Sequence, residues 1–138
     1  MNRTQAAFAP PAKKSVHTAV MPTHSDDAVK WLAEREGAML DRLAELVSQN
    51  SYTDNVEGGL AVGRLLEDTF SVEGLGLSRV PSARFADHLV LSSRGAPGVA
   101  PLALVGHLDT VFPPGTFEGY RDDGDLARGP GVLDMKGG

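Results

Sequence analysis

Residues 101–111 read PLALVGHLDTV, and this stretch decides the fold predicted for the 138-residue chain. Its first six residues are apolar at both alternating positions, which is typical of a strand buried on both faces of an α/β sheet. Side chains alternate along a strand, so His107 and Asp109 are expected side by side where the strand ends. Ligands of open α/β sheets bind beyond the carboxyl ends of strands, which makes this pair a candidate site.

The His107-x-Asp109 pair has the chemistry of a metal ligand and its supporting group. A metal-bound histidine usually donates its second ring N–H to a carboxylate, which fixes the tautomer. Asp109 is a candidate for that carboxylate. The pair alone is also compatible with a surface or satisfied core histidine followed by an aspartate in a turn.

Residues 129–138, GPGVLDMKGG, place a second carboxylate, Asp134, in a glycine-rich turn. A dinucleotide-binding turn requires glycine where Asp134 stands, and a phosphate-binding loop requires Gly-Lys-Ser/Thr, which Lys136 does not provide. A carboxylate on a rigid Gly/Pro turn suits a divalent cation, whereas a simple loop with an aspartate turn is the alternative. Lys136 is expected to neutralise nearby carboxylates or to hold the turn rather than to contact substrate.

In this order and at this separation, the two motifs resemble the opening half of the catalytic domain of metallopeptidase family twenty. That family includes glutamate carboxypeptidases, aminoacylases and succinyl-diaminopimelate desuccinylases. The similarity extends upstream, less sharply, to about Asp26. The resemblance implies that His107 and Asp134 are metal ligands and that Asp109 is the catalytic carboxylate that orients the histidine. It also implies a cis peptide bond after Asp134.

The resemblance further implies the fold and the reaction. The expected fold is α/β, a partial three-layer sandwich with a mixed, mostly parallel sheet, truncated before the lid or dimerisation domain. Residues 25–138 would be the incomplete amino-terminal part of a zinc-dependent catalytic domain. The implied reaction is amide hydrolysis in a small peptide or N-acyl amino acid, with two zinc ions in the complete enzyme, cobalt as an alternative metal, and a homodimer as the assembly.

The general base, a further acidic ligand and a distal histidine of that family have no match in this sequence. The chain is therefore expected to be an amino-terminal fragment that is inactive alone. Two alternatives stay open. The first is a non-catalytic fragment or pseudoenzyme that acts as a binding module and takes up no zinc. The second is a serine hydrolase that uses His107 and Asp109, although the chain has no Gly-x-Ser-x-Gly elbow.

Composition excludes several classes of protein. The net charge of −5 and the lack of a basic, aromatic-rich patch argue against a nucleic-acid partner. No apolar run is long enough for a membrane span, so no membrane partner is expected, and the absence of cysteine excludes disulfides and thiolate ligands. The first residues do not resemble a secretory signal, which predicts a cytoplasmic protein. Residues 1–24 contain three prolines and few large apolar side chains, and they are predicted to be a disordered tail.

Local patterns predict the remaining elements. Ser25 is expected to cap a helix that runs to Ser48, with Asp26 and Asp27 in its first turn. A polar loop over 49–55 precedes a second helix over 57–72, weakened by its glycines. Tyr52 and Asp54 in this loop are interpreted as turn residues near the site. Strands are predicted over 77–80 and 86–92 with His88 facing solvent, then a turn over 95–98 and a long loop over 112–117 beside the site.

Overall fold

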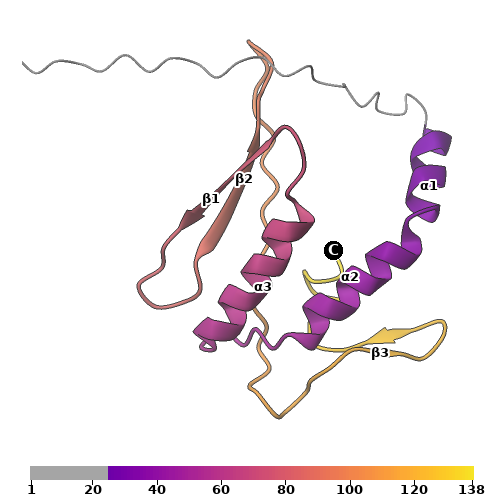
Figure 1. The fold of residues 1–138 in the computed structure, drawn as a ribbon, viewed down its shortest axis with the longest axis vertical. Coiled ribbons are helices and arrows are strands. Elements are labelled where there is room, and N and C mark those ends of the chain that lie inside the picture. The colour runs from indigo at the N-terminus through magenta and orange to yellow at the C-terminus, as the bar shows by residue number, and fades with distance from the viewer. Residues whose placement is uncertain (1–24) are drawn as a thin grey trace, which may run out of the picture. The chain divides into compact units, whose positions relative to one another are not determined.

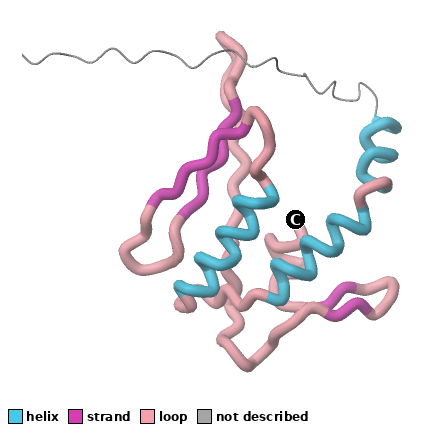
Figure 2. Tube along the Cα trace, in the orientation of Figure 1, coloured by secondary structure: helices cyan, strands magenta, loops and turns pink. Residues whose placement is uncertain are grey.

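The computed structural model describes residues 25–138 (Figure 1), and the tail predicted over 1–24 lies outside the described residues. The described part contains three helices and two small antiparallel sheets, so the fold is mixed α and β (Figure 2). In this part of the chain, no helix is both long enough and apolar enough to cross a membrane.

Helix α1, Ser25–Ala33, carries two aspartates in its first turn, where the helix dipole favours negative charge. None of its residues is buried. The predicted continuous helix over 25–48 is wrong, because a turn at Glu34 and Arg35 separates α1 from α2, Glu36–Ser48. Arg35 has φ −114° and ψ 0°, which interrupts the helical geometry.

Helix α2 packs against α3, Val56–Thr69. The buried apolar side chains of the described residues come from these two helices: Val47 of α2 and Val62 of α3 are almost fully buried, and Leu46 of α2 is 7% exposed. Asn55 caps α3 by accepting a hydrogen bond from the backbone N–H of Gly58 at 3.1 Å. The polar loop predicted between the two helices is confirmed.

Two glycines of α3 lower its helix propensity but permit close packing. A Cβ atom at Gly58 would overlap the carbonyl oxygen of Asn50, and one at Gly59 would lie 2.6 Å from the Cβ of Ala86. The helix therefore approaches both the preceding loop and the segment before β2 more closely than any larger residue would allow. Its end at Thr69 is three residues earlier than the predicted end at Val72.

Strands β1, Leu75–Val80, and β2, His88–Ser93, form an antiparallel hairpin with Leu75 opposite Ser93. They confirm the two predicted strands to within two residues, and His88 is exposed as expected. The Arg79 guanidinium joins the hairpin to α3 by donating from Nε and Nη2 to the two carboxylate oxygens of Glu67, each at 2.5 Å. This bidentate pair fixes the orientation of the hairpin on the helix.

The Glu67–Arg79 pair gives a first testable prediction. The hydrogen bond from Arg79 holds the pKa of Glu67 below its ordinary value. Ionised Glu67 therefore stabilises the fold at pH values above the pKa that Glu67 has in the unfolded chain. This stability is lost as pH falls through the lower pKa that Glu67 has in the native protein. We expect Glu67→Gln to lower Tm slightly at about pH 7 and to leave Tm unchanged at about pH 2, in thermal melts followed by circular dichroism. Glu73→Gln, on an exposed residue outside the pair, is the matched control, and equal effects of the two substitutions would contradict the prediction.

The stretch 101–106, predicted as a buried strand, is not a strand in the structure, and Leu102, Leu104 and Val105 are 88%, 91% and 92% exposed. A buried strand needs backbone partners on neighbouring strands. Neither β1–β2 nor the small hairpin of β3, Arg121–Asp122, and β4, Ala127–Arg128, supplies them. The described residues therefore do not form the mostly parallel sheet of a three-layer sandwich, and their parallel pairing is a single bridge between Tyr52 and Thr110.

Candidate functional site

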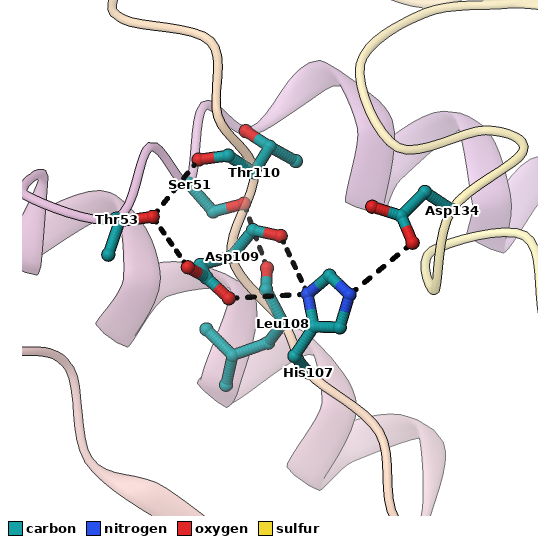
Figure 3. A network of polar contacts seen from close by, with 7 residues as sticks. All are labelled: Ser51, Thr53, His107, Leu108, Asp109, Thr110 and Asp134. Carbon is teal, nitrogen blue, oxygen red and sulfur yellow. Dashed lines mark hydrogen bonds and ion pairs between the residues drawn. The ribbon is translucent and has the colours of Figure 1, made fainter.

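The loop between α2 and α3 holds the segment that carries His107 and Asp109 (Figure 3). The hydroxyl of Ser51 donates to the carbonyl oxygen of Leu108 at 2.9 Å. The backbone N–H of Thr110 donates to the Ser51 carbonyl at 2.8 Å, and the N–H of Thr53 donates to the Thr110 carbonyl at 3.1 Å. These three bonds fix residues 108–110 although no strand runs through them.

Asp109 orients the ring of His107. The Nδ1 atom of His107 lies 3.1 Å from the carbonyl oxygen of Asp109 and 3.2 Å from its Oδ1. Two acceptors of Asp109 face Nδ1, whereas one acceptor, the carboxylate of Asp134, faces Nε2, so we expect the neutral ring to carry its proton on Nδ1. The lone pair of the neutral ring is then on Nε2, which faces away from Asp109 (Figure 3).

Asp134 reaches the other side of the same ring, from the turn near the carboxyl end of the chain (Figure 3). Its Oδ1 lies 3.3 Å from Nε2 of His107. With Nδ1 protonated, two electron-rich atoms face each other across this distance, which is unfavourable unless a proton or another cation lies between them. The structure thus brings together the histidine and the carboxylate that the sequence singled out.

The acceptor groups of Asp109 and Asp134 that surround His107 determine the direction in which its pKa is shifted. Burial lowers the pKa of His107, but the Asp109 carbonyl oxygen and the carboxylates of Asp134 and Asp109 outweigh it and raise the pKa above 6.5. The three side chains stay open to solvent, with 47% of His107, 40% of Asp109 and 71% of Asp134 exposed. A cation can therefore reach the ring nitrogen without displacing a packed side chain.

The turn over 129–138 positions Asp134 through left-handed backbone. Gly131 has φ +83°, and Met135 has φ +45°, which is uncommon outside glycine. The peptide bond after Asp134 is trans, so the cis bond implied by the family resemblance is wrong here. The turn reverses direction through the left-handed torsions at Gly131 and Met135 instead.

Lys136 anchors this turn. Its Nζ donates to the carbonyl oxygens of Leu46 and Gln49, both at 2.9 Å, and the residue is only 9% exposed. Burial lowers the pKa of Lys136 to about 8, which leaves the amine mostly protonated at neutral pH. The expectation that Lys136 holds the turn is confirmed, although its partners are carbonyl groups rather than carboxylates.

Two residues of the site were not predicted from the sequence. The Thr53 hydroxyl donates to Oδ2 of Asp109 at 2.6 Å, and Ser51 is fully buried against Leu108. The sequence does place Thr53 and Ser51 in the polar loop beside the site, but nothing in the loop sequence indicates which hydroxyl group points inward. Because the Ser51 hydroxyl is buried and already bonded, it is not available as the nucleophile of a serine hydrolase.

Thr53 gives a second testable prediction. We expect Thr53→Val, which removes the hydroxyl at nearly constant volume, to lower the free energy of unfolding by about 1 kcal/mol. It should also shift the NMR signals of the His107 ring, since Asp109 loses the donor that orients it. Thr53→Ser retains the hydroxyl and is expected to resemble the unmodified protein in both measurements. Identical behaviour of the serine and valine variants would show that the hydroxyl does not orient Asp109.

His107 and Asp134 are the kinds of ligand that zinc takes in proteins, but they are fewer than the ligands that a catalytic zinc ion usually has. An imidazole nitrogen and a carboxylate oxygen are ordinary zinc ligands, and a catalytic zinc ion usually takes three protein ligands. Within residues 25–138, no group of three or more histidine, cysteine, aspartate or glutamate side chains is arranged to hold a metal ion. A separate cavity of about 350 Å³, lined in part by Phe117, Arg121 and Arg128, includes none of the three site residues.

Comparison with known proteins shows that part of the chain is similar to a curated carboxypeptidase. Over 109 residues, the chain is 34% identical to Carboxypeptidase G2 from Pseudomonas sp. (strain RS-16), and the alignment covers 76% of this chain. The chain spans about a quarter of the length of that curated relative, 26%. No protein-family model matches the chain. The similarity supports a carboxypeptidase-like relationship for this part of the sequence.

Proposed function

We propose that this chain contributes part of the active site of a zinc-dependent hydrolase that cleaves amide bonds, of the metallopeptidase family twenty type. The observation that carries the proposal is the approach of His107 Nε2 to Asp134 Oδ1 at 3.3 Å, while Nδ1 of the same ring faces Asp109. The similarity to a carboxypeptidase supports the hydrolytic class.

In this proposal, His107 and Asp134 hold the zinc ion and Asp109 orients the imidazole. Asp109 keeps the proton on Nδ1, so that the lone pair of Nε2 is free for a cation. Thr53 holds the second oxygen of Asp109, which leaves the first one for His107. When bound, zinc supplies Lewis-acid chemistry that polarises a carbonyl oxygen and lowers the pKa of water.

The remaining parts of the proposal go beyond the described residues. The number of ligands requires at least one further donor, and hydrolysis requires a general base that residues 25–138 do not place at this site. We propose peptides or N-acyl amino acids as substrates and two zinc ions in the complete site. We further propose that residues 101–107 form an interior strand of a three-layer sandwich when strands pair with them on both sides.

Zinc titration of the chelator-treated chain by isothermal calorimetry tests the proposal, together with a hydrolysis assay on a small peptide and an N-acyl amino acid. We expect zinc uptake that depends on His107 and Asp134, without hydrolysis by this chain alone. Absence of zinc uptake would refute the metal site and favour the non-catalytic binding module.

A further inference from the structure

The ammonium group of Lys136 caps the carboxyl end of α2. The last carbonyl groups of a helix have no partner inside the helix and carry partial negative charge. Lys136 Nζ donates to two carbonyls at this end, those of Leu46 and Gln49. A buried cation at this place is therefore stabilised by the helix that it contacts, and it connects segments that are far apart along the chain.

The turn is shaped to let the Lys136 side chain reach α2. A Cβ atom at Gly131 would lie 3.0 Å from Cδ and 3.1 Å from Cγ of Lys136, so glycine leaves the space through which the side chain passes. Pro130, at the start of the same turn, is fully buried. Pro130 and Lys136 thus attach the turn to the interior on both sides of Asp134, whose own side chain is exposed and faces His107.

The position of Asp134 depends on the backbone of this turn. Its N–H donates to the Gly131 carbonyl at 3.2 Å, and its own carbonyl accepts from the N–H of Lys136 at 2.6 Å. The Asp134 side chain is 71% exposed, and its ion pair is with His107. Packing of the side chain therefore contributes little to its placement, and the anchored backbone contributes most.

We propose that Lys136 is a positioning residue, which fixes the turn over 129–138 on the carboxyl end of α2 and thereby holds Asp134 opposite His107. The consequence for metal binding rests on the proposed function, but the placement of Asp134 does not. Lys136 acts through Asp134 and contacts neither the metal nor the substrate.

The first test is made on metal-free protein and measures how far the NMR signals of the His107 ring shift when Asp134 is replaced by asparagine. This shift is called the coupling of His107 to Asp134. Asp134→Asn is expected to shift the NMR signals of the His107 ring in the otherwise unmodified chain, because the two groups are 3.3 Å apart. In a Lys136→Met background, which keeps an apolar stem but removes the donors, the same substitution is expected to leave these signals unchanged. An undiminished shift in that background would overturn the proposal, whatever the result with zinc.

The second test uses Zn²⁺ alone. We expect Lys136→Met to weaken zinc binding by about tenfold, equivalent to about 1.4 kcal/mol, with unchanged helical circular dichroism. Lys136→Arg retains charge and donors and is expected to recover most of the affinity. Lys30→Met, on an exposed lysine of α1, is the matched control and should bind zinc like the unmodified chain. Full affinity in Lys136→Met would contradict the inferred role in metal binding.

The outcomes separate the two proposals. If the unmodified chain takes up no zinc but Lys136→Met abolishes the coupling of His107 to Asp134, the proposed function fails and the role of Lys136 stands. If Lys136→Met does not fold, Lys136→Gln decides, because its neutral amide can still donate to one carbonyl. We then expect a reduced coupling, and a coupling equal to that of the unmodified chain would overturn the proposal.

Discussion

Zinc affinity is expected to fall by about 100-fold or more when His107 is replaced by alanine. Loss of a group that only supports a ligand typically costs 10–100-fold in metal affinity, and loss of the ligand itself should cost at least as much. Asp134→Asn is expected to have a comparable effect, since it removes the anionic oxygen on the other side of the ring nitrogen. Isothermal calorimetry of the chelator-treated proteins measures both effects.

Two exposed residues provide matched controls for this experiment. His88→Ala removes an imidazole from β2, and Asp125→Asn removes a carboxylate from the loop between β3 and β4. Both variants are expected to bind zinc as the unmodified chain does. If His107→Ala and Asp134→Asn bound zinc as well as these controls, zinc would be held elsewhere and the proposed site would be wrong.

Zinc affinity is also expected to depend strongly on pH. The carbonyl of Asp109 and the carboxylates of Asp134 and Asp109 raise the pKa of His107 above 6.5 despite the opposing effect of burial. A proton and a zinc ion compete for the same lone pair on Nε2, so affinity should fall as pH drops through this pKa. Below it, the expected loss approaches about tenfold for each pH unit.

Calorimetric titrations at about pH 7.5 and about pH 5.5 check this prediction, with an expected loss of about tenfold or more between them. Any zinc binding that remains in His107→Ala should no longer depend on the protonation of His107, because the ring nitrogen for which the proton and zinc compete has been removed. An unmodified chain with equal affinity at both pH values would show that the ring nitrogen does not bind the metal.

The metal-free protein should show the opposite trend in stability. Because the pKa of His107 is raised in the native protein, protonated His107 stabilises the fold at pH values below the pKa that His107 has in the unfolded chain. This contribution is lost as pH rises through the native pKa, where the neutral ring leaves its Nε2 lone pair facing the Asp134 carboxylate. High pH therefore removes a stabilising contact from the metal-free site and at the same time prepares the nitrogen for zinc.

Local sequence patterns predicted the elements that depend on local interactions. The β1–β2 hairpin lies within two residues of its predicted strands, and α3 begins one residue before its predicted start. The helix predicted over 25–48 was wrong at Glu34 and Arg35, because the cap and the acidic first turn predict where the helix begins and not that a turn interrupts it. The burial predicted for 101–106 was not found, because burial of a strand depends on neighbours rather than on its own apolar pattern.

The sequence by itself determined which chemical groups are available: an imidazole and a carboxylate two residues apart, and a second carboxylate in a glycine-rich turn. Residue type fixes donor chemistry and turn preference, so both could be predicted. Only the tertiary structure decided that Asp134 faces His107, that Thr53 holds Asp109, and that Lys136 holds the turn on α2. These contacts join residues far apart along the chain, and their geometry depends on how α2, α3 and the turn pack together.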